Sequence, residues 1–304
     1  MVHSQPTQVP TIPAVPGARI PAAPARLVVS LLLYVATGLL GGTPGPVAGQ
    51  QTAGDTLTEP STLSRLEGAG AAMLSDTWSV LKAPANLDSD GAKTLLGIAG
   101  VGAALFAFDE QIDRMVQDRR DRPIPKAIED VGEFLEPLGN VGGPTVLMTV
   151  GWAVAGATGQ SKASLILQEL VTAQLIGTAT RHVARHIVGR SRPRDGEGAY
   201  AFSFGGGTSF PSGHASTITQ VAWILSHHVE SPWIRGAIWT GAGTVMYQRL
   251  TSGAHWASDV WFGAFWGWGI AKVVVAARES EWIELAPSVD PGGGGLGLQG
   301  RITF

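Results

Sequence analysis

Three short stretches in the second half of the chain carry the residue types that phosphate chemistry requires. Together they supply three arginines, two histidines and one aspartate, in Arg185-x6-Arg192-Pro193, Pro211-Ser212-Gly213-His214 and Arg249-x5-His255-x3-Asp259. Guanidinium groups bind phosphate oxygens, one imidazole can attack phosphorus, and a second imidazole can protonate the departing oxygen. Each stretch alone is weak evidence, and the three in this order predict a site for phosphoryl chemistry.

In the third stretch, His255 and Asp259 are spaced to lie on one face of a helix. If a helix begins near His255, Asp259 follows one turn later. A carboxylate there can accept a hydrogen bond from one ring nitrogen, which fixes the tautomer and leaves the other nitrogen as a nucleophile. Arg249, at the end of the preceding helix, would bind phosphate oxygens. The alternative is a structural His–Asp pair at i,i+4.

The second stretch predicts the N-terminus of a helix. Ser212 and Gly213 precede an apolar helical segment, and free N–H groups together with the helix dipole make such an end an anion site. Gly213 allows the backbone to approach an oxyanion closely, and His214 would lie beside it as a proton donor. The alternative is an ordinary Ser N-cap with His214 as a bystander.

The first stretch places arginines at a helix C-terminus and just beyond it. Arg185 and Arg192 can form bidentate bonds to phosphate that a Lys cannot form. The alternative is a basic helix end that the macrodipole favours, and we prefer that interpretation for Arg181, Arg190 and Arg194.

Composition excludes several other classes of chemistry. Hydrophobic residues make up 44% of the 304 residues and charged residues 15%, below the roughly 25% charged residues of soluble domains. A net charge of −3 gives no electrostatic signature for nucleic acid. The chain has no Cys, which excludes disulfides and Cys-ligated metals. It also lacks HExxH, Asp-rich loops and clustered carboxylates, which are sequence patterns of metal sites.

The N-terminal segment indicates export or membrane anchoring. Residues 1–26 are Pro-rich and lack acidic side chains, and an apolar run then extends from Leu27 to about Leu40. This run is shorter than the ~20 residues of a comfortable spanning helix. We expect a signal peptide or an N-terminal anchor in residues 1–49, and a linker in 50–75. Either one places the remainder in the cell envelope, in the cytoplasmic membrane or the periplasm.

The rest of the chain predicts an all-α fold. Six apolar segments lack the period-two alternation of strands, at about 94–108, 138–158, 164–188, 214–229, 234–248 and 256–277. We therefore expect a bundle of about six core helices with the active site at one end. It would form a helical domain over 76–284, with a charged connection over 109–126. Residues 285–304 are expected to be a Gly-rich C-terminal tail, either disordered or docked at an edge of the domain.

The three stretches resemble the signature of the phosphatidic acid phosphatase type 2 and vanadium haloperoxidase superfamily. That signature reads Lys-x6-Arg-Pro, then Pro-Ser-Gly-His, then Ser-Arg-x5-His-x3-Asp. The resemblance covers about residues 94–277, with the motifs confined to 185–259. Two positions differ from the pattern, since Arg185 replaces the Lys and Gln248 replaces the Ser.

The resemblance implies specific roles. His255 would attack phosphorus and form a phosphohistidine, Asp259 would orient it, and His214 would protonate the leaving group. The phosphate oxygens would be bound by three guanidinium groups and two amides, those of Arg185, Arg192, Arg249, Ser212 and Gly213.

The implied activity is that of a metal-independent phosphatase acting on a phosphomonoester or diphosphate, with a phosphorylated lipid or small phosphate ester as substrate and the membrane as partner. Three alternatives stay open. They are a haloperoxidase with vanadate as cofactor, a phosphotransferase to an alcohol or lipid, and a non-catalytic envelope protein that binds phospholipid.

The side of the membrane is open at this stage. The family pattern places the site outside the cytoplasmic membrane, but counting spans from an exported residue 50 places Arg185 and Arg192 in the cytoplasm. Either the site is cytoplasmic, or one early helix does not span, or the enzyme is a soluble exported bundle.

Overall fold

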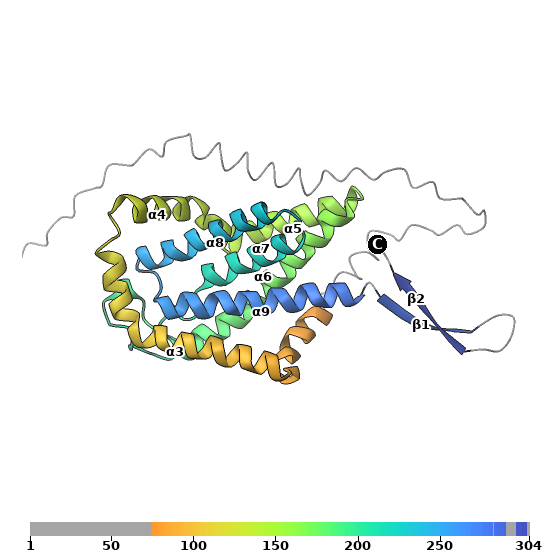
Figure 1. The fold of residues 1–304 in the computed structure, drawn as a ribbon, viewed down its shortest axis with the longest axis horizontal. Helices are drawn as coiled ribbons and strands as arrows, with labels where there is room; N and C mark the ends of the chain where they lie inside the picture. Colours follow the sequence, from red (N-terminus) through yellow and green to blue (C-terminus); the bar gives the residue numbers. More distant parts are fainter. Residues whose placement is uncertain (1–73, 282, 290–295, 303–304) are drawn as a thin grey trace, which may run out of the picture. The chain divides into compact units, whose positions relative to one another are not determined.

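The structure is a computed structural model that describes residues 74–281, 283–289 and 296–302 (Figure 1). Residues 74–82 are helical. The elements that follow are η1 (Ala83–Asn86), α3 (Ser89–Gln117), α4 (Pro123–Leu135), η2 (Glu136–Gly139), α5 (Gly142–Ala157), α6 (Ser161–Val188), η3 (Pro193–Asp195), α7 (Gly213–His227), α8 (Pro232–Thr251), α9 (Ala257–Glu281), β1 (Ile283–Val289) and β2 (Leu296–Ile302). The predicted helical bundle is confirmed.

The first apolar segment is longer than predicted. α3 continues through Gln117, and α4 begins at Pro123, so most of the charged stretch over 109–126 is helical. The prediction of a connection there is wrong because Asp109 faces inward. Its carboxylate is fully buried and pairs with Arg190, so a charged residue that suggested solvent belongs to the inner face of a helix.

The main apolar core lies between α6, α7 and α9. Its buried side chains come from all three helices and include Ile166, Leu170, Ile224, Ile270 and Val274. A second cluster joins α7 to α8 through Ile218, Ala222, Ala242 and Val245. α7 therefore contacts α6, α8 and α9, and these helices can position whatever its N-terminus holds (Figure 1).

Two glycines on α9 bring its backbone against that of α7. A Cβ at Gly263 would lie 2.4 Å from the carbonyl oxygen of Ser212, and one at Gly267 would lie 2.2 Å from that of Ser216. Only glycine permits this approach without displacement of the helices. The contact holds the first turns of α7 and α9 together, and the Ser212 N–H donates to the Asp259 carbonyl at 3.0 Å.

The segment between α6 and α7 leaves the helix at Gly189. Gly189 has φ +57°, and a Cβ there would lie 1.7 Å from the Ser203 carbonyl oxygen. Because the left-handed conformation ends α6 abruptly, the next residues leave the helix axis. Arg190 then forms an isolated antiparallel bridge with Phe202.

The C-terminal residues form a β-hairpin rather than the tail that we expected. β1 and β2 pair antiparallel, with Ile283 opposite Ile302 and Val289 opposite Leu296. The predicted signal or anchor in 1–49 lies outside the described residues, as does the linker up to residue 73.

Two helices of the described chain are long and apolar enough to cross a membrane, judged by length and composition alone. They are α3 and residues 257–279 of α9. The apolar window of α3 is 6% buried within the protein, whereas that of α9 is 39% buried.

Candidate active site

The three sequence motifs meet where four helices end. Arg185 lies in the last turn of α6 and Arg249 in the last turn of α8, whereas His214 and Asp259 lie in the first turns of α7 and α9. Because the C-terminal ends of α6 and α8 lie beside the N-terminal ends of α7 and α9, the side chains of Arg185 and Arg249 face the N-terminus of α7. The residues of the predicted site therefore gather at one end of the bundle.

His255, the predicted nucleophile, lies between α8 and α9 and is 2% exposed. Its Nδ1 is 2.7 Å from the carbonyl oxygen of Ser209. A carbonyl only accepts, so Nδ1 carries the proton and donates it, and Nε2 keeps its lone pair. Burial, followed by the charges of Arg192 and Arg185, lowers the pKa of His255 well below its usual value. The ring is therefore neutral and its Nε2 is nucleophilic.

Asp259 does not form the predicted hydrogen bond with His255. Its carboxylate instead accepts from Arg190 Nη1 at 2.6 Å, from Ser209 Oγ at 2.5 Å and from the Trp256 N–H at 3.0 Å. Because the hydroxyl of Ser209 binds Asp259 while its carbonyl binds His255, Asp259 can orient the imidazole only through Ser209.

Arg190 is the partner of Asp259 in place of His255, which was the predicted one. It is 1% exposed, and its Nη2 donates to Asp109 on α3 at 2.7 Å while its Nη1 holds Asp259. Its assignment to a basic helix end favoured by the macrodipole is wrong, because Arg190 lies beyond the end of α6 and binds two buried carboxylates. A buried ion pair needs its remaining donors satisfied, and Arg190 achieves this through Ala199 O at 2.9 Å and Ser258 Oγ at 2.8 Å.

The N-terminus of α7 has the geometry of an anion site. Ser212 caps the helix by accepting from the Ala215 N–H at 3.4 Å. The amide of Ser212 is already bonded to Asp259, contrary to the expectation that it binds phosphate, and the amides of Gly213 and His214 have no acceptor among the described residues. A Cβ at Gly213 would lie 2.6 Å from Arg185 Nη2, so glycine lets this guanidinium lie directly over the helix end.

Arg249 is held by two acceptors. Its Nη2 lies 3.0 Å from Glu136 Oε1 on η2, and the same nitrogen donates to Gln248 Oε1. Gln248, which replaces the family's Ser, thus accepts from Arg249 rather than donating. The sequence motifs gave no indication of Glu136, a carboxylate that lies within this candidate site.

His214 faces Glu136 across the site. Its Nε2 lies 3.3 Å from Glu136 Oε1, but without the angles of a hydrogen bond. Burial, then the charge of Arg249, lowers the pKa of His214 to about 4, while Glu136 opposes the shift. A bound phosphate would add negative charge and favour protonated His214, which is the form that a proton donor requires.

Arg192 completes the cationic set. It lies just before η3, and its Nε donates to Thr208 Oγ1 at 3.1 Å. Burial and neighbouring arginines lower the pKa values of Arg185 and Arg192. Such crowding of like charges indicates a site built to receive an anion.

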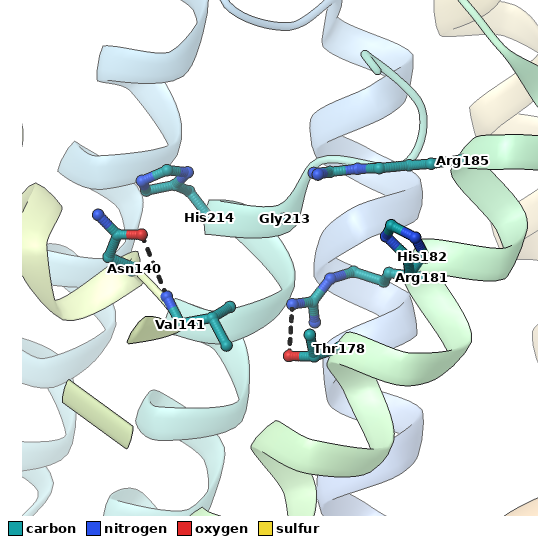
Figure 2. Close-up of a pocket in the computed structure, with 9 residues that line it drawn as sticks. Asn140, Val141, Thr178, Arg181, His182, Arg185, Gly213 and His214 are labelled. Carbon is teal, nitrogen blue, oxygen red and sulfur yellow. Dashed lines mark hydrogen bonds between the residues drawn. The ribbon is translucent and has the colours of Figure 1, made fainter. Parts of the chain in front are cut away.

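A cavity of about 150 Å³ opens between Arg185 and His214. Figure 2 shows these side chains on opposite sides of Gly213, with Asn140 on the side of His214 and Arg181 on the side of Arg185. Within the residues that the structure describes, no three His, Cys, Asp or Glu side chains stand close enough together to hold a metal ion.

Four residues of this arrangement had no signal in the motifs. Ser209 acts through its backbone carbonyl, which no side-chain pattern reveals. Glu136 and Asp109 lie far upstream of the motifs, and Arg190 stands among other arginines where nothing singles it out.

Residues 166–282 match the model of the PAP2 superfamily, a range that contains all the motif residues. The match covers less than half of the chain, and this segment is similar to the PAP2 superfamily. Arg185, His214 and His255 all lie within the matched range. The expected superfamily and the all-α fold are confirmed.

Two individual proteins are similar to this chain. A lipid A 1-phosphatase of Porphyromonas gingivalis is 28% identical over 169 residues, which cover 54% of this chain and 34% of that protein. The match thus spans about a third of the relative's length. The crystal structure of Aquifex aeolicus LpxE shares 17% identity, covering 57% of this chain and 95% of that chain. Its TM-score of 0.40 is too low to carry an argument.

Proposed function

We propose that the chain is a metal-independent phosphatase that hydrolyses a phosphorylated lipid through a phosphohistidine at His255. The observation that carries this proposal is the state of His255. Its Nδ1 is engaged by Ser209, and its neutral Nε2 adjoins the charges of Arg185 and Arg192. A neutral nucleophile beside fixed cations is what attack on a phosphate dianion requires.

Binding of the phosphoryl group would precede chemistry. Its oxygens would be bound by Arg185, Arg192 and Arg249, and by the free amides of Gly213 and His214. These donors are fixed before substrate arrives, so they would stabilise transition-state charge with little reorganisation. In phosphoryl transfer, positioning and charge stabilisation supply most of the rate enhancement.

In the first chemical step, His255 Nε2 would attack phosphorus as the bond to the leaving oxygen breaks. The electron pair stays on that oxygen, and His214 donates a proton to it. In the second step, neutral His214 takes a proton from water, whose oxygen attacks the phosphorus and breaks the P–N bond. Orthophosphate leaves, and both imidazoles return to their starting state.

A lipid substrate and a membrane-associated location are favoured by the surface of the domain. Large apolar side chains stand exposed on α3 and α5, including Leu96 at 72% and Leu147 at 73%. Contiguous apolar surface marks a membrane or protein interface, and α3 passes the length and composition test for a span. The relative named as a lipid A 1-phosphatase supports the same substrate class.

The decisive experiment measures orthophosphate release from phosphatidate and from soluble phosphomonoesters, with EDTA present, on membrane and soluble fractions. We expect lipid phosphate to be the better substrate. His255→Ala should lower turnover about 10³-fold or more. The control is His227→Ala, since His227 lies at the far end of α7 and pairs with Glu279.

Rapid quenching at high pH should trap a phosphoryl group that is stable to alkali and labile to acid, and His255→Ala should abolish it. Full activity in His255→Ala, or complete loss of activity with EDTA that added metal restores, would refute the proposed mechanism.

A further inference from the structure

Arg181 is a buried cation that lacks a carboxylate partner in the described part of the chain. Its side chain is 3% exposed, and its guanidinium donates only to hydroxyls, those of Ser216 at 2.9 Å, Thr178 at 3.3 Å and Thr217 at 3.5 Å. Burial, followed by repulsion from Arg185, lowers its pKa to about 10. It therefore stays protonated at neutral pH.

A charge in this state is expensive to retain. Burying an ion without a counter-ion costs several kcal/mol, and hydroxyl groups recover only part of that cost. Arg190, which is buried to the same degree, has two carboxylates. A side chain that only joins α6 to α7 needs hydrogen bonds but no charge. The charge of Arg181, which has no carboxylate partner among the described residues, therefore indicates that an anionic ligand binds here.

The position of Arg181 shows where that anion would bind. Arg181 and Thr178 line the same cavity as Arg185, Gly213 and His214. Arg181 lies one turn before Arg185 on α6, below it in Figure 2, with its bond to Thr178 drawn. Since His214, the proposed proton donor to the leaving oxygen, lines this cavity together with Arg181, a leaving group protonated by His214 would depart into the cavity that Arg181 lines.

The leaving group itself decides whether Arg181 has a partner. A leaving alkoxide oxygen that takes a proton becomes a neutral alcohol, which offers no charge to pair with a buried guanidinium. A leaving phosphoryl group is an anion, and guanidinium is its preferred partner. Four guanidinium groups adjoin this site, those of Arg181, Arg185, Arg192 and Arg249. Of the carboxylates near them, Glu136 already pairs with Arg249 and Asp259 with Arg190.

We propose that the cavity beside Arg181 binds a second phosphoryl group, linked through a bridging oxygen to the one that is transferred, so that the preferred substrate is a diphosphate ester. This inference rests on the proposed function. His255 Nε2 would attack the terminal phosphorus, and the bond from that phosphorus to the bridging oxygen would break. The bridging oxygen keeps the electron pair, takes the proton of His214 and leaves as part of a phosphomonoester bound to Arg181.

The test compares binding of two soluble probes to the purified protein by calorimetry. One is orthophosphate, and the other is methylenediphosphonate, whose P–C–P link cannot be hydrolysed. We expect the wild type to bind the diphosphonate more tightly. Arg181→Gln should weaken diphosphonate binding about 10- to 100-fold and orthophosphate binding by less than about 3-fold. The control is Arg194→Gln, which removes an exposed cation after Arg192.

Turnover provides the second measurement, on a lipid diphosphate and the lipid monophosphate with the same chain. Arg181→Gln should lower kcat/KM for the diphosphate only, and Arg181→Lys should restore part of it. Equal losses for both probes, or no loss for either, would overturn the subsite. If the protein hydrolyses the monophosphate and shows no preference for the diphosphate that depends on Arg181, the second phosphoryl subsite is refuted but the proposed phosphatase activity stands. Arg181-dependent diphosphonate binding without any turnover keeps the subsite and refutes the phosphatase.

Discussion

Replacement of Arg190 by Met should be the most destabilising single change beneath the active site. Arg190 bridges Asp109 on α3 and Asp259 on α9 at 2.7 and 2.6 Å, and all three side chains are at most 1% exposed. Met fills much of the same volume, so the main effect is two buried carboxylates without a counter-ion. The ring centroids of Phe106 and Trp256 lie 4.8 and 5.5 Å from Arg190 Cζ, so these aromatic rings would pack against an apolar Met side chain.

The magnitude follows from the charges that remain. Breaking one buried pair costs about 3–5 kcal/mol. Here two carboxylates lose the same partner, but Asp109 keeps the N–H and hydroxyl of Ser258, and Asp259 keeps Ser209 and the Trp256 amide. We therefore expect the upper end of that range, about 5 kcal/mol. For a domain of this size that lowers Tm by about 10–20 °C.

Graded variants keep the reasoning testable if Arg190→Met does not fold. Arg190→Lys keeps the charge but cannot bridge both carboxylates with fixed geometry, so its loss should be intermediate. Asp109→Asn keeps an acceptor for Ser258 and leaves one carboxylate for one guanidinium, so it should cost about 1 kcal/mol. Unfolding is followed by Trp fluorescence during heating. Arg194→Met, at an exposed position, should change stability by less than about 0.5 kcal/mol. Equal losses for Arg190→Met and Arg194→Met would refute the argument.

Three further predictions concern the site and its packing. The low pKa of His214 leaves it deprotonated as pH rises above about 4, so kcat/KM should fall toward alkaline pH. Glu136→Gln removes the charge that raises this pKa and should move the falling limb of the kcat/KM profile about one pH unit lower. An unchanged pH profile in this variant would contradict the argument. Gly263→Ala places a Cβ 2.4 Å from the backbone before α7 and should cost about 1–3 kcal/mol in thermal unfolding, whereas Gly269→Ala, with open space around it, should not destabilise. Arg185→Lys keeps the charge that stabilises the transition state and loses the planar fork, so steady-state kinetics should show KM raised about 3- to 10-fold with kcat nearly unchanged. A collapse of kcat would show that the fork, and not the charge alone, stabilises the transition state.

The helices that carry the motifs were predictable because their apolar segments and caps agree. Gly213 and His214 open α7 where Ser212 predicts an N-cap, and Arg249 closes α8 just before His255. Because these residues lie alternately at C-terminal and N-terminal helix ends, their position at one end of the bundle could be predicted without knowledge of side-chain contacts. Local signals were sufficient here because capping and helix periodicity act within a few residues.

The partners of the charged groups were not predictable, since they depend on tertiary pairing. The i,i+4 spacing of His255 and Asp259 allowed a direct bond, but the buried Arg190 requires the same carboxylate. α3 extends past Asp109 because that side chain is buried against Arg190, 81 residues away. Sequence spacing shows which contacts are possible within one helix, and it cannot show which of two acceptors a distant cation takes.

The pairing that the structure adopts suits the chemistry better than the predicted one. A carboxylate bonded directly to His255 would favour its protonated, non-nucleophilic form, because a nearby negative charge raises the pKa of an imidazole. The Ser209 carbonyl fixes the same tautomer with a neutral group, and Arg190 holds the charge of Asp259 away from the ring. His255 therefore stays neutral, whereas a bound phosphate favours the protonated form of His214. The two imidazoles can then be in opposite protonation states at one pH, which the proposed first step requires.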